Sequence, residues 1–138
     1  MVKVTGADKH KRRLRAMRSQ AARDLVYRAL YAAGNMIEVE AEISITAGSV
    51  SGKGHVPSAP GEPPNADTRL LDGSIETTGQ RRAMRVYVTS NAPYSAALEF
   101  GTSKMVERPF MQPAADKKRD AAVTLVRQAI QRSTKLGG

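Results

Sequence analysis

A proline- and glycine-rich segment in the middle of the chain, residues 47–67, limits what this sequence can fold into. It reads AGSVSGKGHVPSAPGEPPNAD, contains four glycines and four prolines, and has neither a helical nor a strand period. Loops longer than about 12–15 residues are uncommon in small domains, and prolines favour extended polyproline geometry. We therefore predict an extended arm between two structured halves, whose reaching part consists of Val56, Pro57, Pro60, Gly61, Pro63 and Pro64.

The half before this arm has the pattern of a long helix. From Ser19 to about Thr46 apolar side chains recur at three- and four-residue spacing, which is typical of an amphipathic helix. Ser19 is a suitable N-cap, and the basic segment 8–18 either forms a short helix before it or continues it. Glu38, Glu40 and Glu42 are unfavourable near the negative end of the helix dipole. We expect this end of the helix to fray or to meet a basic neighbour.

The half after the arm contains strand patterns and then a second helix. SIETTG and AMRVYVTS alternate apolar and polar residues around the turn GQRR, which predicts an antiparallel hairpin with one buried face and, as a possible addition, a third strand. From Pro109 to about Lys135 the helical spacing returns, and Pro109 suits a first helical turn. We expect this helix to pack on the sheet or against the first long helix. The predicted class is α+β in a single domain, 1–138, with a frayed tail at 133–138.

The apolar side chains available for a core are small. Aromatic residues make up 4% of the sequence, with two phenylalanines and no tryptophan. A fully buried Leu, Ile or Met contributes only about 1.5–3 kcal/mol, against about 1–2 kcal/mol to order the backbone of each residue. Such a thin core favours association of the chain with copies of itself.

Positive charge is concentrated at the N-terminus. The net charge is +9, and in segment 1–18 the lysines and arginines are opposed only by Asp8. A block of this kind is usually a solvated helix or arm, but clustered cations also bind phosphates or an acidic protein surface. No aromatic residue lies among these cations, which disfavours a dedicated single-strand binder. The candidate contacts with DNA or an acidic partner are Arg12, Arg13, Arg15 and, at the hairpin turn, Arg81 and Arg82.

Residues that could support catalysis are scarce. The chain has no cysteine, and its two histidines, His10 and His55, lie in separate polar segments. The glycines of the arm match neither a Walker loop nor a dinucleotide fingerprint, and glutamates two residues apart on a helix diverge rather than converge on a metal. We predict no enzyme, and no catalytic residue, metal site or cofactor.

No membrane partner is predicted either. The sequence has no apolar run long enough to span a bilayer and no recognisable signal peptide, so we expect a protein made in the cytoplasm.

The most unusual stretch is residues 92–115, APYSAALEFGTSKMVERPFMQPAA. We predict a short helical turn beginning at Pro93, with an apolar face of Tyr94, Ala97, Leu98 and Phe100. Gly101 then permits a reversal of the chain. Glu99 lies among apolar residues, where an unpaired carboxylate is costly. We expect it to pair with a cation or to cap backbone amides.

Ion pairing is the structural role we favour for the carboxylates of this stretch. Glu99 and Glu107 have no acid–base partner nearby in the sequence, whereas Arg108 and Lys104 are close.

The run APYSAALEFGTSKMVERPFMQPAAD resembles the hallmark segment of the neck proteins of tailed phages, the head–tail joining or tail-completion family of long non-contractile-tailed phages. The family's pattern of an aromatic residue, Glu-Phe-Gly-Thr, Arg-Pro-Phe and Pro-Ala is carried here by Tyr94, Glu99, Phe100, Gly101, Thr102, Arg108, Pro109, Phe110, Pro113 and Ala114. SAPGEPPNADTRLLDGSI is similar to the family's loop before the hairpin, although Arg69 follows Thr68 where the family often has Thr-Gly. Together the matches cover about residues 58–116.

The resemblance implies a structural virion protein that forms a hexameric ring in the neck, assembled in the host cytoplasm. Its implied partners are copies of itself, the head-side connector or adaptor rings, the tail terminator or tail-tube protein, and genomic DNA passing non-specifically through the channel. The arm 47–67 would clamp an adjacent subunit or ring, and the pivot motif would be structural. Two alternatives stay open, namely a tail terminator that caps the tail tube and a free basic DNA-binding protein.

Overall fold

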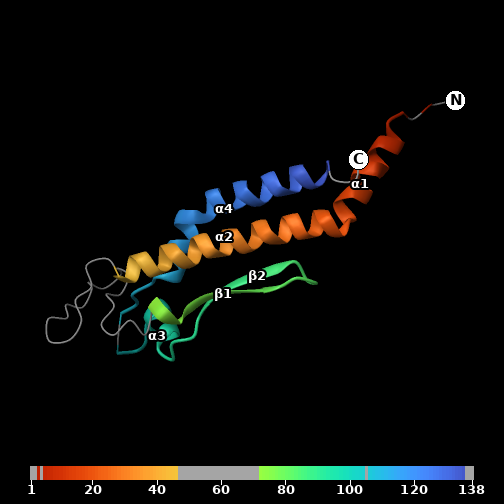
Figure 1. Cartoon of the computed structure of the whole chain (residues 1–138). Coiled ribbons are helices and arrows are strands. Elements are labelled where there is room, and N and C mark those ends of the chain that lie inside the picture. The colour runs from red at the N-terminus through yellow and green to blue at the C-terminus, as the bar shows by residue number, and fades with distance from the viewer. Residues whose placement is uncertain (1–2, 4, 47–71, 105, 136–138) are drawn as a thin grey trace.

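The computed structural model describes residues 3, 5–46, 72–104 and 106–135, and it confirms the α+β class (Figure 1). Three layers lie side by side, with α2 between α4 on one side and the β1–β2 hairpin on the other. The elements are α1 (Ala7–Arg18), α2 (Gln20–Thr46), η2 (Asp72–Ser74), β1 (Ile75–Gln80), β2 (Arg85–Ser90), α3 (Ser95–Phe100) and α4 (Met111–Ser133). The arm predicted at 47–67 lies outside the described residues.

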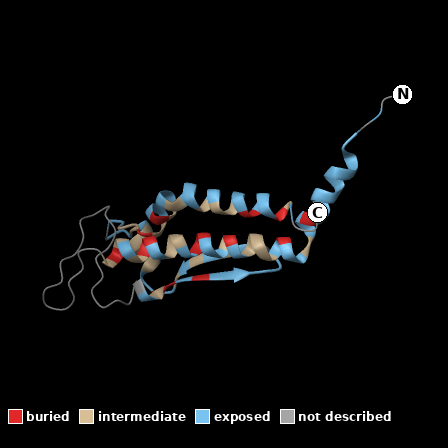
Figure 2. Ribbon diagram, turned by 45° about the horizontal axis from the view of Figure 1, so that its top comes forward, coloured by how far each residue is buried: buried red, intermediate tan, exposed pale blue. Residues whose placement is uncertain are grey.

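Ser19 separates the basic N-terminal helix from the long one. Its backbone is extended, with φ −65° and ψ 154°, and its Oγ accepts a hydrogen bond from the amide of Ala22 at 3.2 Å. The same hydroxyl donates to the carbonyl of Ala16 at 2.7 Å. Ser19 is therefore the N-cap of α2, as predicted, and α1 is a separate helix that projects from one end of the molecule (Figures 1 and 2).

The hairpin packs on α2 through one face. Val86 and Val88 alternate with exposed residues along β2, and both side chains approach Gly34, where an added Cβ would lie 2.8 Å from Val86 Cγ1. The Tyr31 hydroxyl donates to the carbonyl of Thr77 at 2.8 Å, and the Thr77 hydroxyl donates to Glu38. The described sheet has two strands, paired from Ile75 opposite Ser90 to Gln80 opposite Arg85, so it does not include the possible third strand.

The C-terminal helix packs chiefly against α2 rather than on the sheet. Both helices bury alanines, including Ala22, Ala29 and Ala33 on α2 and Ala114 and Ala129 on α4. Small side chains let two helix backbones approach closely. The face of α4 that could have packed on the hairpin is therefore occupied by its contact with α2. α2 is therefore the only one of these layers that contacts both of the others extensively within the described residues (Figure 2).

A buried carboxylate links the two long helices. Glu40 is 8% exposed and forms ion pairs with Lys117 and, at 3.8 Å, with Lys118 on α4. The hydrogen bond from Lys117 is the main reason that the pKa of Glu40 lies below its usual value, and it outweighs the opposing effect of burial. The predicted basic neighbour of the acidic helix end is thus present. Glu38 and Glu40 point to different elements, the hairpin and α4, because residues two apart on a helix lie on opposite faces.

No described helix is both long and apolar enough to cross a bilayer. At the other end from α1, a buried cluster of the described residues contains Ala41, Ile45, Ile75, Ala92, Phe110 and Ala114.

We predict that Gly34→Ala destabilises the protein by about 1–3 kcal/mol. Alanine normally stabilises a helix interior by about 1 kcal/mol relative to glycine. Here, however, the new methyl group would lie 2.8 Å from Val86 Cγ1 and 2.9 Å from Thr77 Cγ2, and β-branched side chains on strands move little. Chemical denaturation measures the change. Gly73→Ala is the matched control, because no atom lies within 4 Å of its added Cβ. An increase in the stability of the Gly34 variant would contradict the close packing.

We predict that Glu40→Gln lowers the free energy of unfolding by about 1–2 kcal/mol at neutral pH. The pKa of Glu40 is lowered in the folded state from an ordinary value of about 4.5. Its stabilisation is therefore complete above that value and is lost as pH falls through the folded pKa. The difference between wild type and variant should shrink on acidification, as measured by denaturation at pH 7 and at acidic pH. The exposed Asp120 supplies the control variant Asp120→Asn, and an equal effect of both substitutions would contradict the role of Glu40.

Candidate functional site: the α3–α4 junction and its groove

The motif that resembles the phage neck proteins folds into a compact junction between α3 and α4. Tyr94 is the N-cap residue of α3, and Gly101 ends the helix with φ 74°, a conformation that favours glycine. The amide of Gly101 donates to the carbonyl of Ala97 at 2.8 Å. The predicted reversal at Gly101 is confirmed.

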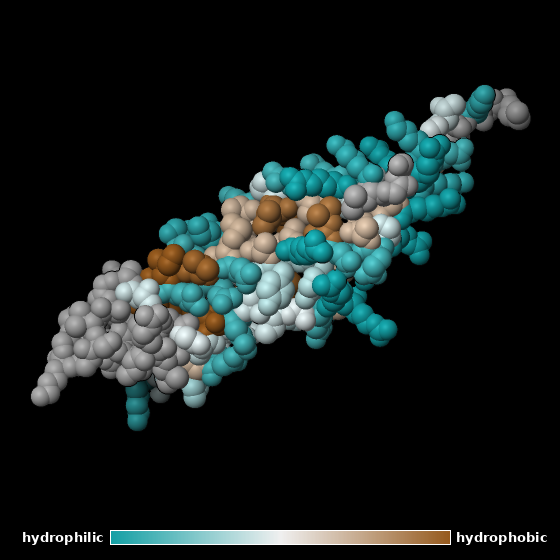
Figure 3. Space-filling model, viewed as in Figure 1, coloured by the Kyte–Doolittle hydropathy of each residue, from teal (hydrophilic) through white to brown (hydrophobic). Residues whose placement is uncertain are grey.

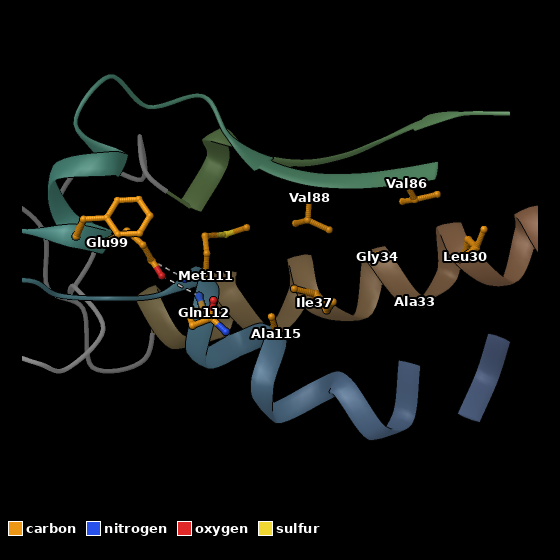
Figure 4. Close-up of a pocket in the computed structure, with 11 residues that line it drawn as sticks. Leu30, Ala33, Gly34, Ile37, Val86, Val88, Glu99, Met111, Gln112 and Ala115 are labelled. Carbon is orange, nitrogen blue, oxygen red and sulfur yellow. Dashed lines mark hydrogen bonds between the residues drawn. The ribbon is translucent and has the colours of Figure 1, made fainter. Parts of the chain in front are cut away.

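Glu99 caps the N-terminus of α4 from across this junction. Its Oε2 accepts hydrogen bonds from the amides of Phe110 at 2.9 Å and Met111 at 3.0 Å, and its Oε1 accepts one from Gln112 at 2.9 Å (Figure 4). A helix leaves its first four amides, counted from the N-cap, without a partner inside the helix. The N-cap of α4 is Phe110, so the fourth residue is Pro113, which has no amide hydrogen. One carboxylate therefore satisfies every amide donor that the start of α4 leaves free.

This cap decides between the two roles predicted for Glu99. It caps backbone amides, and within the described residues neither Glu99 nor Glu107 forms an ion pair with Arg108 or Lys104. The helix begins at Met111 rather than at Pro109. The reason is that the anchoring carboxylate comes from α3 and fixes the first turn after Phe110.

The Arg-Pro-Phe part of the motif anchors the returning chain. The amide of Arg108 donates to the carbonyl of Leu98 at 2.6 Å, while Phe110 is 1% exposed in the buried cluster. The Arg108 Nε atom is buried without a hydrogen-bond partner. Pro109 lies between these two anchors, where its ring restricts the backbone. Thr102 accepts a hydrogen bond at its Oγ1 from the amide of Lys104 at 3.2 Å.

The two phenylalanines of the motif have opposite environments, because Phe110 is buried and Phe100 is exposed. Leu98 packs against the buried cluster, as predicted for the apolar face of α3. In contrast, Phe100 is 81% exposed and Tyr94 is 40% exposed, so neither belongs to the core. The turn of α3 that aims Glu99 at α4 leaves its neighbour Phe100 on the outside.

An apolar groove lies beside Phe100. It has a volume of about 480 Å³ and runs between α2, β2 and the start of α4 (Figure 4). Its apolar lining includes Leu30, Ala33, Ile37, Val86, Val88 and Met111, with Phe100 among the lining residues. The groove is of a size that accepts side chains of a partner, and nothing in its lining suggests acid–base chemistry apart from Glu99, which is fully used as a cap.

None of the candidate cationic contacts lines this groove. Arg12, Arg13 and Arg15 are exposed on α1. Arg81 is held in place, since it pairs with Asp24 at 2.7 Å and lies 5.0 Å from the centre of the Tyr27 ring. Arg82 is exposed at the hairpin turn. The arm residues at 56–64 lie outside the described part of the chain.

Sequence reasoning missed the glycine that shapes the groove. Gly34 is buried in the middle of α2 and lines the groove, and a glycine in a helix interior is itself a signal of close approach by another element. Among the described residues no group of histidine, aspartate and glutamate is placed to hold a metal ion. Comparisons with models of protein families, with curated proteins and with solved structures found no match.

We predict that Glu99→Gln destabilises the protein by about 1–3 kcal/mol, because the amide group cannot accept hydrogen bonds with both terminal atoms. Hydrogen exchange at the amides of Phe110, Met111 and Gln112 should accelerate, whereas exchange in the middle of α2 should change only with global stability. Glu107→Gln, which changes an exposed carboxylate of the same loop, is the control. Unchanged exchange at the three amides would contradict the capping role.

Proposed function

We propose that this chain is a structural subunit of the neck of a tailed phage, where copies form a hexameric ring that joins the DNA-filled head to the tail. The ring continues the DNA channel, and its neighbours are the head-side connector or adaptor rings and the tail terminator or tail-tube protein. The protein acts by assembly rather than by catalysis, in the virion neck.

The observation that carries this proposal is the exposure of Phe100 beside an apolar groove. Phe100 belongs to the motif that resembles the neck family, and it is 81% exposed. Placing a phenylalanine in water forgoes about 1.5–3 kcal/mol of burial free energy. A second surface that covers Phe100 and the groove would recover that free energy.

The small core supports the same reading. Phe110 and Ile45 are the largest fully buried apolar side chains of the described residues. Other large apolar residues are exposed, including Val39 at 50% and Ile43 at 53% on α2. They lie on the side of α2 away from Gly34, as the spacing of a helix requires. Apolar surface on two different sides of one subunit is what a head-to-tail ring needs, because each copy then meets two neighbours through unlike surfaces.

The neck and terminator positions differ in their partners. A pull-down with the protein as bait separates them, because the neck reading expects capture of both the head-side connector and the tail side. Capture of the tail-tube protein alone favours the terminator.

We predict that light scattering across concentration and salt gives the mass of a hexamer for the wild type, and that Phe100→Ser shifts the protein toward monomers. Tyr87→Ser is the matched control, since Tyr87 is an aromatic residue exposed to 40% on the outer face of β2. It should leave the mass unchanged. A monomeric wild type that also stays monomeric with purified connector and tail tube would contradict the ring. If the Phe100→Ser variant still assembled, Phe100 would not be part of the contact between copies.

A further inference from the structure

One end of the molecule gathers cations from four elements. α1 forms the projecting part of this end (Figure 1), and the face of it seen in Figure 3 is mostly hydrophilic. Its cations are all exposed, and they are Lys9, Lys11, Arg12, Arg13, Arg15 and Arg18.

The chain path brings other cations to the same end. Arg23 and Arg28 are exposed in the first turns of α2, directly after α1. The hairpin turn reaches this end too, because the Arg23 guanidinium donates to the carbonyl of Arg82 at 3.1 Å. Arg82 and Arg85 are both exposed there. The turn is therefore fixed against α2 with its cations outward.

The last turns of α4 add further cations to this end of the molecule. The helix packs antiparallel to α2 (Figure 1), so that its last turns return to the start of α2, and α1 also contacts α4. Arg127, Arg132 and Lys135 are exposed in this part of the chain. We call the surface formed by the cations of α1, the first turns of α2, the hairpin turn and residues 127–135 the basic end.

Negative charge is almost absent from the basic end. Within residues 7–28, 80–85 and 127–135 the acidic residues are Asp8 and Asp24, and Asp24 is paired with Arg81. The remaining acidic residues of the described chain lie on segments closer to the other end, where Glu40 and Glu99 are already used in structural contacts. The separation of charge arises from the topology and is not visible in the net charge.

We propose that the basic end binds the phosphate backbone of double-stranded DNA. Binding energy would come from the release of counterions from the phosphates, which needs exposed cations rather than shaped pockets. Contacts between proteins differ, because the centres of such interfaces are depleted of charged residues. This inference rests on the proposed function for the biological source of the DNA. It deepens that function because it names the surface that meets the DNA, and it adds the cations of α4 and β2 to the contacts predicted from the sequence.

The dimensions of α1 agree with this ligand. Its 12 residues give a length of about 18 Å at 1.5 Å per residue. Duplex DNA carries about one negative charge per 1.7 Å of axis, so the length of α1 alone spans roughly ten phosphate charges. No base-reading pattern is needed, and the binding is independent of sequence.

The test uses cations that the sequence alone would assign to a solvated helix face. Fluorescence anisotropy measures the affinity of the full-length protein for two unrelated duplexes across a range of salt concentrations. We expect equal affinity for the two duplexes. Arg127→Ala combined with Arg132→Ala should weaken binding about tenfold or more and reduce the slope of log affinity against log salt by about 2.

The control removes the same charge from residues outside the basic end. Lys104→Ala combined with Arg119→Ala deletes two exposed cations and should change affinity less than about twofold. Equal weakening by both double variants would overturn the proposal, because net charge alone would then explain binding. No binding by the wild type at low salt would also overturn it, as would displacement of the DNA by polyglutamate at matched charge, which would indicate an acidic protein partner. Light scattering of the same samples reports the ring separately, so failure of DNA binding and failure of assembly remain distinguishable.

Discussion

The carboxylate of Glu99 connects the parts of this fold that the chain itself separates. α3 follows the hairpin, and α4 begins only after a loop, so the direction of α4 would otherwise be fixed only by its contact with α2. Three amide hydrogen bonds to one side chain fix the start of α4 directly beside α3. The bond from the Arg108 amide to Leu98 closes the same loop, and Phe110 is thereby delivered into the buried cluster. The capped junction thus holds the hairpin, α3 and α4 around the end of α2.

α2 determines what remains available for partners. Its small residues receive α4 on one side and the hairpin on another, with Gly34 allowing the closest approach. Two layers packed on one helix leave apolar residues of that helix uncovered, and they include Val39 and Ile43 on the side away from the groove. The same arrangement sends cations to one end of the molecule. A molecule with apolar sides and a basic end is suited to the proposed lateral contacts between copies and to the proposed contact of its tip with a polyanion.

Local signals made much of this predictable. The N-cap at Ser19 and the alternating strands of the hairpin depend on residues a few positions apart, and the structure confirms both. α4 begins at Met111 rather than at the predicted Pro109, because its cap comes from Glu99, 11 residues before Phe110. No local pattern indicates a distant cap. The exposure of Phe100 and the burial of Phe110 could not be separated, since both are phenylalanines in one irregular stretch. The partner of α4 depends on how closely alanine-rich faces approach, which only the packed structure shows.

The proposed function requires this chain to form a closed ring around a channel. Negative-stain electron microscopy of the purified protein, alone and mixed with the head-side connector, tests it most directly. We expect rings with a central opening that admits a DNA duplex, present alone or stacked on the connector. At higher resolution, the basic end of each copy should be turned toward the opening. Images that contain only monomers or closed twofold dimers, with and without the connector, would contradict it.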